Sequence, residues 1–364
     1  MNCKWIIAFI FLGLAWFVFQ VVQFLGLTKE LKIHGIEKCR KINIENPAED
    51  IIAYKNLAIG ATSDIINLFL KHNSLPLVTP GYLFAVDPAK NLYYRIKTYN
   101  FNTQYAFNPH GITIFNDKLY VLSHSFNKGG ERIFVFSLSF TTEIEAEFVK
   151  SIEIDQNHGL YNSLIFVDEE QFFLTQWSAF ADPPEGRDFS FSSEIKRIWG
   201  IFSPSGTVKR CKVDGEKANC QEIMKGYMPN GIEIIGNKMF IAESIEKKVK
   251  VYEIKENFDL EFKDEVQLEY SPDNLRAYNG DIYTTGNFRS VDIITLTDAL
   301  NSNKPLPMIP GIAGRIYLKG TKWVTQNLLT EDILSFPTSC IITNNTFLLT
   351  GIIENHILAC TLDS

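Results

Sequence analysis

The chain opens with one long apolar segment. The run from Trp5 to Leu27 is interrupted only by Gln20 and Gln23. A helix needs about 20 apolar residues to span a bilayer, so this run is long enough. A cleaved signal peptide has a shorter apolar core and a small-residue exit, and neither is evident here. We therefore expect an uncleaved signal anchor over residues 1–28, with cleavage as the alternative.

Residues 29–364 carry a repeated pattern of alternating strands. "HGITIFNDKLYVLSHS" from His110 and "NGIEIIGNKMFIAESI" from Asn230 share a polar residue, a Gly-Ile pair, an alternating strand, a polar turn and a second strand. Fainter versions begin at Glu49, Asn162, Asn274 and Ser339. The pattern therefore predicts six similar units.

Each unit contains three or four short strands with a period of two. So few strands cannot bury both of their faces alone. Units of this size, arranged radially, bury their faces against their neighbours and form a β-propeller. The sequence therefore predicts an all-β, six-bladed β-propeller over residues 29–364, preceded by the N-terminal helix.

Cysteine positions fit a ring that is closed covalently. Cys39 and Cys360 bracket the soluble chain, and a bridge between them would tie the start of the first blade to the last strand. For Cys39 and Cys360, the alternative is that they are unrelated thiols. Cys211 and Cys220 flank a glycine turn and suit a second, local bridge. Asn344 begins the sequon "NNT", a candidate glycosylation site. We expect the propeller in the lumen of the secretory pathway or outside the cell, anchored to the membrane.

Composition excludes one class of partner. The chain has 35 Lys and Arg against 42 Asp and Glu, for a net charge of −7, and its lysine-rich pieces are interleaved with glutamate. No basic stripe is available to neutralise phosphates, so nucleic acid is not expected as a partner. The 46% hydrophobic content provides for a sizeable core.

The repeat brings polar residues to one place. The inner strand of each blade lines the central channel, so equivalent strand ends converge there. The residues at or beside these ends are Glu49, His110, Asn162, Asn230, Asp273 and Asn274. Two carboxylates and three carboxamides make an oxygen-rich site that suits Ca²⁺, whereas zinc favours His and Cys. For a single Asn, capping a turn is the alternative; the aligned set favours ligation.

These motifs resemble the paraoxonase family of calcium-dependent arylesterases and lactonases. The resemblance runs from about residue 30 to the end of the chain. It is carried by "FNPHGITIF" around His110, "NPAED" ending in Glu49 and Asp50, "PNGIEI" at Asn230, "SPDNLRA" at Asp273 and Asn274, and the flanking Cys39 and Cys360. It implies a retained N-terminal hydrophobic segment and a six-bladed propeller with two calcium ions in its tunnel.

The resemblance also assigns ligands. The catalytic calcium would be held by Glu49, Asn162, Asn230, Asp273 and Asn274, all of the expected types. The second calcium would use Asp50, the carbonyl of Ile112, and an aspartate at the position that is Ser163 here. Loss of that carboxylate weakens the second site, because calcium affinity follows the charge of the ligands.

The proton-transfer pair implied by the resemblance is His110 and His124. Calcium would polarise an ester or lactone carbonyl, while His110, assisted by His124, deprotonates the attacking water. An ordinary histidine pKa suits this task at neutral pH. The expected function is hydrolysis of a small ester or lactone.

Several positions depart from the family pattern. Where the family usually has Asn-Asp-His, this chain has Gln176, Trp177 and Ser178, and a tunnel histidine common in the family is Asn287. These changes favour an alternative function: an inactive propeller that assists the assembly of membrane-protein clients, a role known for some membrane-anchored relatives. A propeller of the strictosidine-synthase or gluconolactonase type is a more distant alternative.

An insertion rich in aromatic residues spans residues 177–202, which we expect between the third and fourth blades. It suits a lid over the pocket or a surface for a partner. The alternative is a covered loop followed by blade strands.

Overall fold

The computed structural model describes residues 26–63, 80–186, 190–289 and 304–361, with short pieces between 12 and 22, at 65–66 and between 292 and 302. Most of the expected anchor, residues 1–28, lies outside the described residues. Within the part that is described, no helix is long and apolar enough to cross a membrane.

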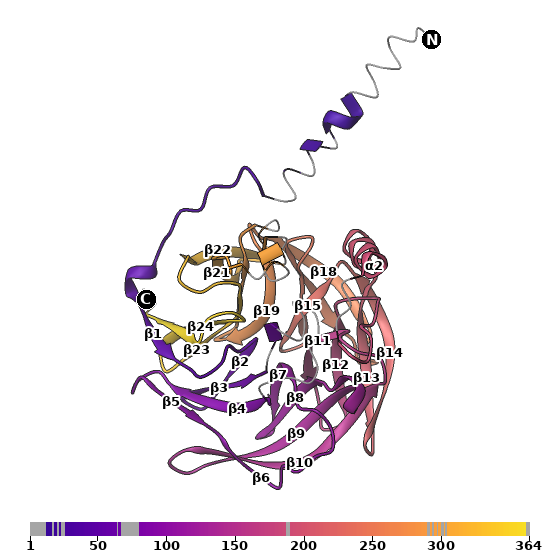
Figure 1. The fold of residues 1–364 in the computed structure, drawn as a ribbon, viewed down its shortest axis with the longest axis vertical. Helices are drawn as coiled ribbons and strands as arrows, with labels where there is room; N and C mark the ends of the chain where they lie inside the picture. Colours follow the sequence, from indigo (N-terminus) through magenta and orange to yellow (C-terminus); the bar gives the residue numbers. More distant parts are fainter. Residues whose placement is uncertain are drawn as a thin grey trace.

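The described strands form six antiparallel units of four strands, arranged radially (Figure 1). The first three blades are β2 (Asp50–Tyr54), β3 (Leu57–Thr62), β4 (Tyr82–Asp87), β5 (Leu92–Arg95); β7 (Pro109–Phe115), β8 (Lys118–His124), β9 (Glu131–Phe140), β10 (Ile144–Asp155); and β11 (Tyr161–Phe166), β12 (Gln171–Gln176), β13 (Gly206–Asp214), β14 (Lys217–Gly226). The short strand β6 (Lys97–Tyr99) pairs with β10, and one parallel bridge joins β10 to β14.

The other three blades complete the ring. They are β15 (Pro229–Ile235), β16 (Lys238–Glu243), β17 (Lys248–Ile254), β18 (Leu260–Gln267); β19 (Ser271–Tyr278), β20 (Asp281–Asn287), β21 (Gly311–Lys319), β22 (Lys322–Glu331); and β23 (Pro337–Thr343), β24 (Thr346–Gly351), β25 (His356–Cys360), β1 (Cys39–Asn43). All six repeat starts lie at or beside an inner strand, so the expected mainly β propeller-like fold is confirmed.

The inner strands contact one another in a closed cycle. The contacts run from β2 to β7, β11, β15, β19, β23 and back to β2. Between the first and second blades, apolar side chains such as Ile59, Val121 and Phe134 form one core cluster, and further clusters lie between the other blades. Each sheet thus buries its two faces against its neighbours, as the radial arrangement requires.

A repeated irregularity aims the inner strands at the axis. In five blades the pairing of the inner strand shifts near its start: between Pro109 and Ile112, Tyr161 and Leu164, Pro229 and Ile232, Pro272 and Leu275, and Pro337 and Ser339. Such bulges bend a strand and re-aim the side chains beside them. Most of the candidate site residues lie inside these intervals.

The glycine of the repeat permits close contact between blades. A Cβ at Gly111 would lie 2.2 Å from the carbonyl oxygen of Asn162, and one at Gly231 would lie 2.5 Å from the backbone nitrogen of Leu275. Backbone therefore packs on backbone at these two points, which only glycine allows.

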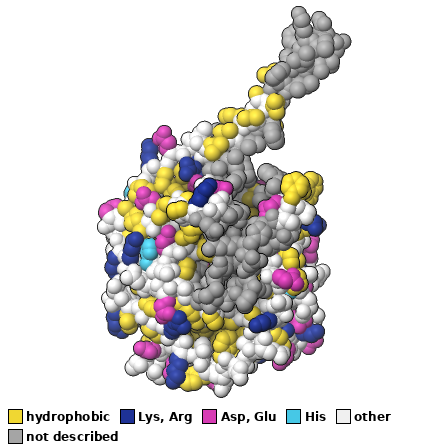
Figure 2. Space-filling view, in the orientation of Figure 1, with side chains coloured by type: hydrophobic (Ala, Val, Ile, Leu, Met, Phe, Trp, Pro, Cys, Tyr) yellow, Lys and Arg dark blue, Asp and Glu magenta, His cyan; other side chains and the backbone are white. Residues whose placement is uncertain are grey.

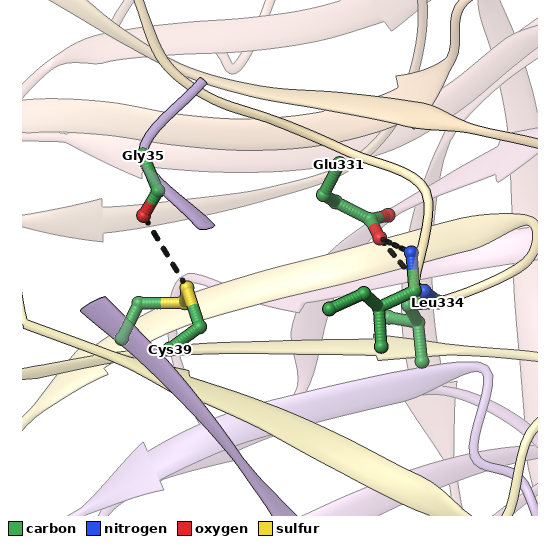
Figure 3. The surroundings of a disulfide bond; sticks show 6 residues. Gly35, Cys39, Glu331 and Leu334 are labelled. Carbon is green, nitrogen blue, oxygen red and sulfur yellow. Dashed lines mark hydrogen bonds between the residues drawn. A yellow bond between two sulfur atoms is a disulfide. The ribbon is translucent and has the colours of Figure 1, made fainter. Parts of the chain in front are cut away.

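The ring is closed by β1, which pairs with β25 with Cys39 opposite Cys360. The expected disulfide between these cysteines is present (Figure 3). Our assignment of Cys39 to the first blade was wrong, because β1 is the outer strand of the last blade. A second disulfide joins Cys211 to Cys220, across β13 and β14.

The insertion lies inside the third blade, between β12 and β13, and not between the third and fourth blades as we expected. It contains helix α2 (Phe191–Phe202), whose first turn is capped by Ser190 accepting from the N–H of Ser193. Phe191 and Trp199 are 82% and 68% exposed, so the helix is not a covered loop. Hydrophobic side chains gather where α2 lies (Figure 2).

The two disulfides close loops of very different length, with sequence separations of 321 and 9 residues. Replacing Cys39 and Cys360 together by Ser should lower the free energy of unfolding by about 5 kcal/mol, because the longer loop constrains the unfolded chain more. The matched control, Cys211 and Cys220 to Ser, should lower it by about 2–3 kcal/mol. Urea unfolding under non-oxidising conditions measures both; equal losses would contradict the closing role of the Cys39 bridge.

Candidate metal centre and histidine pair

The structure brings the five expected ligands of the catalytic calcium together in the interior. Glu49 directly precedes β2, Asn162 lies in β11, Asn230 in β15, and Asp273 and Asn274 in β19. The Asn274 side-chain amide donates to Glu49 Oε1 at 2.7 Å, and the Asn230 side chain is hydrogen-bonded to Asp273. Four different parts of the chain therefore meet at one point.

Each of the five side chains has one buried oxygen with no hydrogen-bond partner among the described residues. These atoms are Glu49 Oε2, Asn162 Oδ1, Asn230 Oδ1, Asp273 Oδ1 and Asn274 Oδ1. Leaving one such atom unsatisfied costs about 1–3 kcal/mol. Native proteins rarely leave several together unless an ion or water binds them. Hard oxygen donors of this kind fit Ca²⁺, which takes 6–8 oxygens.

Electrostatics in the set favour a cation. Burial raises the pKa of Asp273 well above its usual range, and the neighbouring Glu49 carboxylate adds to this effect. A positive ion bound by the two carboxylates would offset the free-energy cost of burying their negative charges close together. Within the described ranges, no group of three or more His, Cys, Asp or Glu side chains forms a metal site; in this set, amides supply three of the five donors.

The two expected histidines lie beside this set. His110 Nε2 lies 3.1 Å from Asn162 Nδ2 and 3.6 Å from Glu49 Oε1. Its other ring nitrogen, Nδ1, lies 2.9 Å from His124 Nε2, with the two rings edge to face. His124 is fully buried and is linked to the ligand set through this contact with His110. The structure thus brings together both histidines and the ligand set.

Glu131 extends the histidine pair into a chain of three. Its carboxylate lies 2.8 and 2.9 Å from His124 Nδ1 and also accepts from the backbone N–H of Gly159. Sequence analysis missed this residue. The available signal was a charged residue opening the apolar third strand, "ERIFVF", which pairs Glu131 with His124 across β8 and β9.

The donor and acceptor of each hydrogen bond in the series His110–His124–Glu131 follow from the groups at its two ends, Asn162 and Glu131. Asn162 presents an N–H to His110 Nε2, so that nitrogen must accept. His110 then carries its proton on Nδ1 and donates to His124 Nε2, and His124 donates from Nδ1 to an ionised Glu131. Burial raises the pKa of Glu131, while the Gly159 N–H opposes the rise. If Glu131 were protonated, it would donate to His124 Nδ1, and His124 Nε2 would donate to His110 Nδ1. The proton of His110 would then lie on Nε2.

The residues expected for the second calcium have a different partner. Asp50 accepts from the N–H of Ile112 at 2.9 Å, from the hydroxyl of Ser339 at 2.7 Å and from the guanidinium of Arg276. Arg276 also donates to the carbonyl of Ile112 at 3.0 Å. Both expected ligands are therefore bound to a cationic side chain, and a second calcium does not fit this arrangement.

Sequence analysis missed Arg276 as well. Alternate residues of a strand share a face, so its position two residues after Asn274 indicated that it faces the same side. Ser163, which stands at the expected aspartate, is fully buried, and its hydroxyl has no hydrogen-bond partner among the described residues.

The other departures from the family pattern lie at the ends of second strands, at or just after the end of β12 and at the end of β20. The backbone N–H of Trp177 donates to the carbonyl of Leu160, and the side-chain amide of Gln176 donates to the carbonyl of Ser178. Asn287, at the end of β20, is buried with its Oδ1 unpartnered within the described residues.

Comparison with known proteins places these residues in a family. A protein-family model for arylesterases matches residues 74–306. The chain belongs to the arylesterase family. Its curated relatives include a serum paraoxonase/lactonase 3 of Oryctolagus cuniculus, 27% identical over an alignment of 270 positions that covers 69% of this chain and 68% of the relative. The protein of the same name from Homo sapiens is 28% identical over an alignment of 182 positions, which covers 46% of this chain and 45% of that protein.

A solved structure is similar in fold alone. The PQQ-bound aldose sugar dehydrogenase from Streptomyces coelicolor matches with a TM-score of 0.51 and 12% identity, over 92% of this chain and 98% of that one.

Members of the arylesterase family are typically hydrolases of the paraoxonase and lactonase type and are generally calcium-dependent. The family assignment from the sequence motifs is thus confirmed.

The tautomers of the histidine pair are open to measurement. In mildly alkaline solution, we expect His110 and His124 both to carry a proton on Nδ1 and none on Nε2, as the direction of the chain requires. Replacing Glu131 by Gln should reverse both tautomers, because the Gly159 N–H would hold the amide oxygen and leave the amide N–H facing His124 Nδ1. Nitrogen chemical shifts of selectively labelled histidine report the difference. Unchanged shifts in the variant would contradict the three-membered chain.

Proposed function

We propose that this protein is a calcium-dependent hydrolase of carboxylic esters or lactones. The observation that carries the proposal is a group of five buried oxygens, without hydrogen-bond partners in the described part of the chain, beside a histidine whose Nε2 faces them. The five side chains would hold one Ca²⁺. When bound, calcium would polarise the substrate carbonyl and stabilise negative charge on its oxygen.

In this proposal the chain's own residues manage the proton. When the attacking water replaces the Asn162 N–H at the single lone pair of His110 Nε2, that unprotonated nitrogen accepts a proton from the water. The charge that results on the His110 ring is stabilised through Nδ1 by His124 and beyond it by the Glu131 carboxylate. Asn162 orients the ring through its amide N–H. The same proton can then pass to the leaving alcohol.

We place the protein in the secretory pathway, anchored by its N-terminal segment, with the propeller in the lumen or outside the cell. The two disulfides support an oxidising compartment. Asn344 supports it further, because it lies exposed in the turn between β23 and β24, where a glycan would be accommodated.

A second candidate is a non-catalytic propeller that binds a membrane-protein client. It is favoured by the exposed apolar residues Phe191, Ile195 and Trp199 on one side of α2. The replaced positions Ser163, Trp177, Ser178 and Asn287 also favour it. In this role one calcium would act as a structural ion.

An assay of the full-length chain separates the two candidates. Phenyl acetate and simple lactones should be hydrolysed in the presence of calcium, and a chelator should abolish turnover until calcium is restored. His110→Gln should lower kcat by roughly 10²- to 10⁴-fold, because the general base is lost. His34→Gln, at an exposed histidine, is the matched control. Bound calcium without turnover above buffer would leave only the second candidate.

The pH dependence tests the role of Glu131. Burial raises its pKa, so the carboxyl keeps its proton to a higher pH than an ordinary glutamate. Below that pKa the reversed chain leaves a proton on His110 Nε2, so kcat should rise with pH through the pKa of Glu131. Glu131→Gln should lower kcat by roughly 10²- to 10⁴-fold and remove this limb.

The exposed Glu147→Gln, in the neighbouring strand β10, is the control for that experiment and should leave the profile unchanged. A Glu131→Gln enzyme that kept the native pH profile of kcat would exclude Glu131 from the proton path.

A further inference from the structure

We propose that the guanidinium of Arg276 is the resident cation at the position where the family resemblance implies a second calcium. This chain would then bind one Ca²⁺ fewer than the resemblance implies, and the inference on the second position does not require the first to be filled.

The geometry places the guanidinium on the second-site ligands. Arg276 is 6% exposed and donates to the Asp50 carboxylate and to the carbonyl of Ile112. It also donates to the carbonyl of Ile51 at 2.9 Å and to that of Leu275 at 2.9 Å. Four acceptors therefore surround one planar group with five N–H donors, which leaves little of it unsatisfied.

The negative charge of Asp50 is offset here without a metal, because the positive charge of Arg276 lies against it. A calcium ion added here would place two further positive charges beside Arg276. Ser163, at the expected aspartate, is neutral and supplies no charge to hold it. The nearby Glu233 already accepts from the backbone N–H groups of Ile234 and Ala277.

The arginine also connects distant blades. It extends from β19 of the fifth blade and bonds backbone carbonyls in β2 of the first blade and β7 of the second. A bound ion would make the same kind of link by coordinating oxygens from several strands. Here the link is covalently part of the chain, so it persists when calcium is removed.

Exchanging the two residues tests the inference. In the double variant Ser163→Asp with Arg276→Ser, the carboxylate returns and the guanidinium leaves. Calcium bound to the full-length chain, counted by elemental mass spectrometry after gel filtration in calcium buffer, should rise by one ion per chain relative to the native protein. Ser163→Asp alone is the matched control and should bind no additional ion, because Arg276 still fills the position.

The difference in bound calcium between the double variant and the native protein tests this inference separately from the proposed function. A native count of zero with one ion in the double variant would refute the calcium of the proposed hydrolase and support the role of Arg276. Equal counts in the native protein and the double variant would overturn the inference whatever the native count.

Two further measurements cover a double variant that does not fold. A native protein with two bound calcium ions would overturn the inference directly. Arg276→Ser alone should lower the folded-to-unfolded ratio by roughly 10²- to 10³-fold in chelator, because Asp50 loses its buried partner. A ratio unchanged by that substitution would also overturn it.

Discussion

The interior of this propeller is constrained by buried negative charge. Glu49 and Asp50 are consecutive at the start of the first blade and both are buried, and Asp273 reaches the same region from the fifth blade. Carboxylates taken out of water remain ionised only when cations or several hydrogen bonds compensate them. Two kinds of cation meet that requirement. Arg276 compensates the charge of Asp50. The oxygens around Glu49 and Asp273 that have no partner among the described residues mark where a metal ion would compensate the other two carboxylates.

This charge can be gathered at one point because of how the inner strands begin. The bulges at the strand starts turn side chains towards the axis, and Gly111 and Gly231 let neighbouring backbones pack without a Cβ between them. A regular strand would place these side chains on alternating faces, half of them against the next blade. The repeated pair of a polar residue followed by glycine thus marks, in the sequence, the positions at which side chains face the central channel.

Local signals predicted much of this arrangement. Period-two alternation and turn residues located all six inner strands, and the expected ligands and His110 lie at or beside equivalent ends of these strands. What failed depends on packing between distant segments. The strand with Cys39 joins the last blade, and the insertion at 177–202 lies within a blade; neither follows from spacing along the chain. Glu131 and Arg276 were missed because their meaning depends on partners across a hairpin or across the ring.

A guanidinium and a calcium ion differ as structural elements even where they satisfy the same oxygens. The ion must be acquired after synthesis and can be lost at low calcium, whereas the arginine is present as soon as the strands meet. Fixing one position with Arg276 separates the two tasks that a pair of metal ions would share. The link between the first, second and fifth blades becomes independent of calcium, and only the open position beside His110 still responds to it. On the proposed function, the calcium concentration would then control catalysis without controlling the fold.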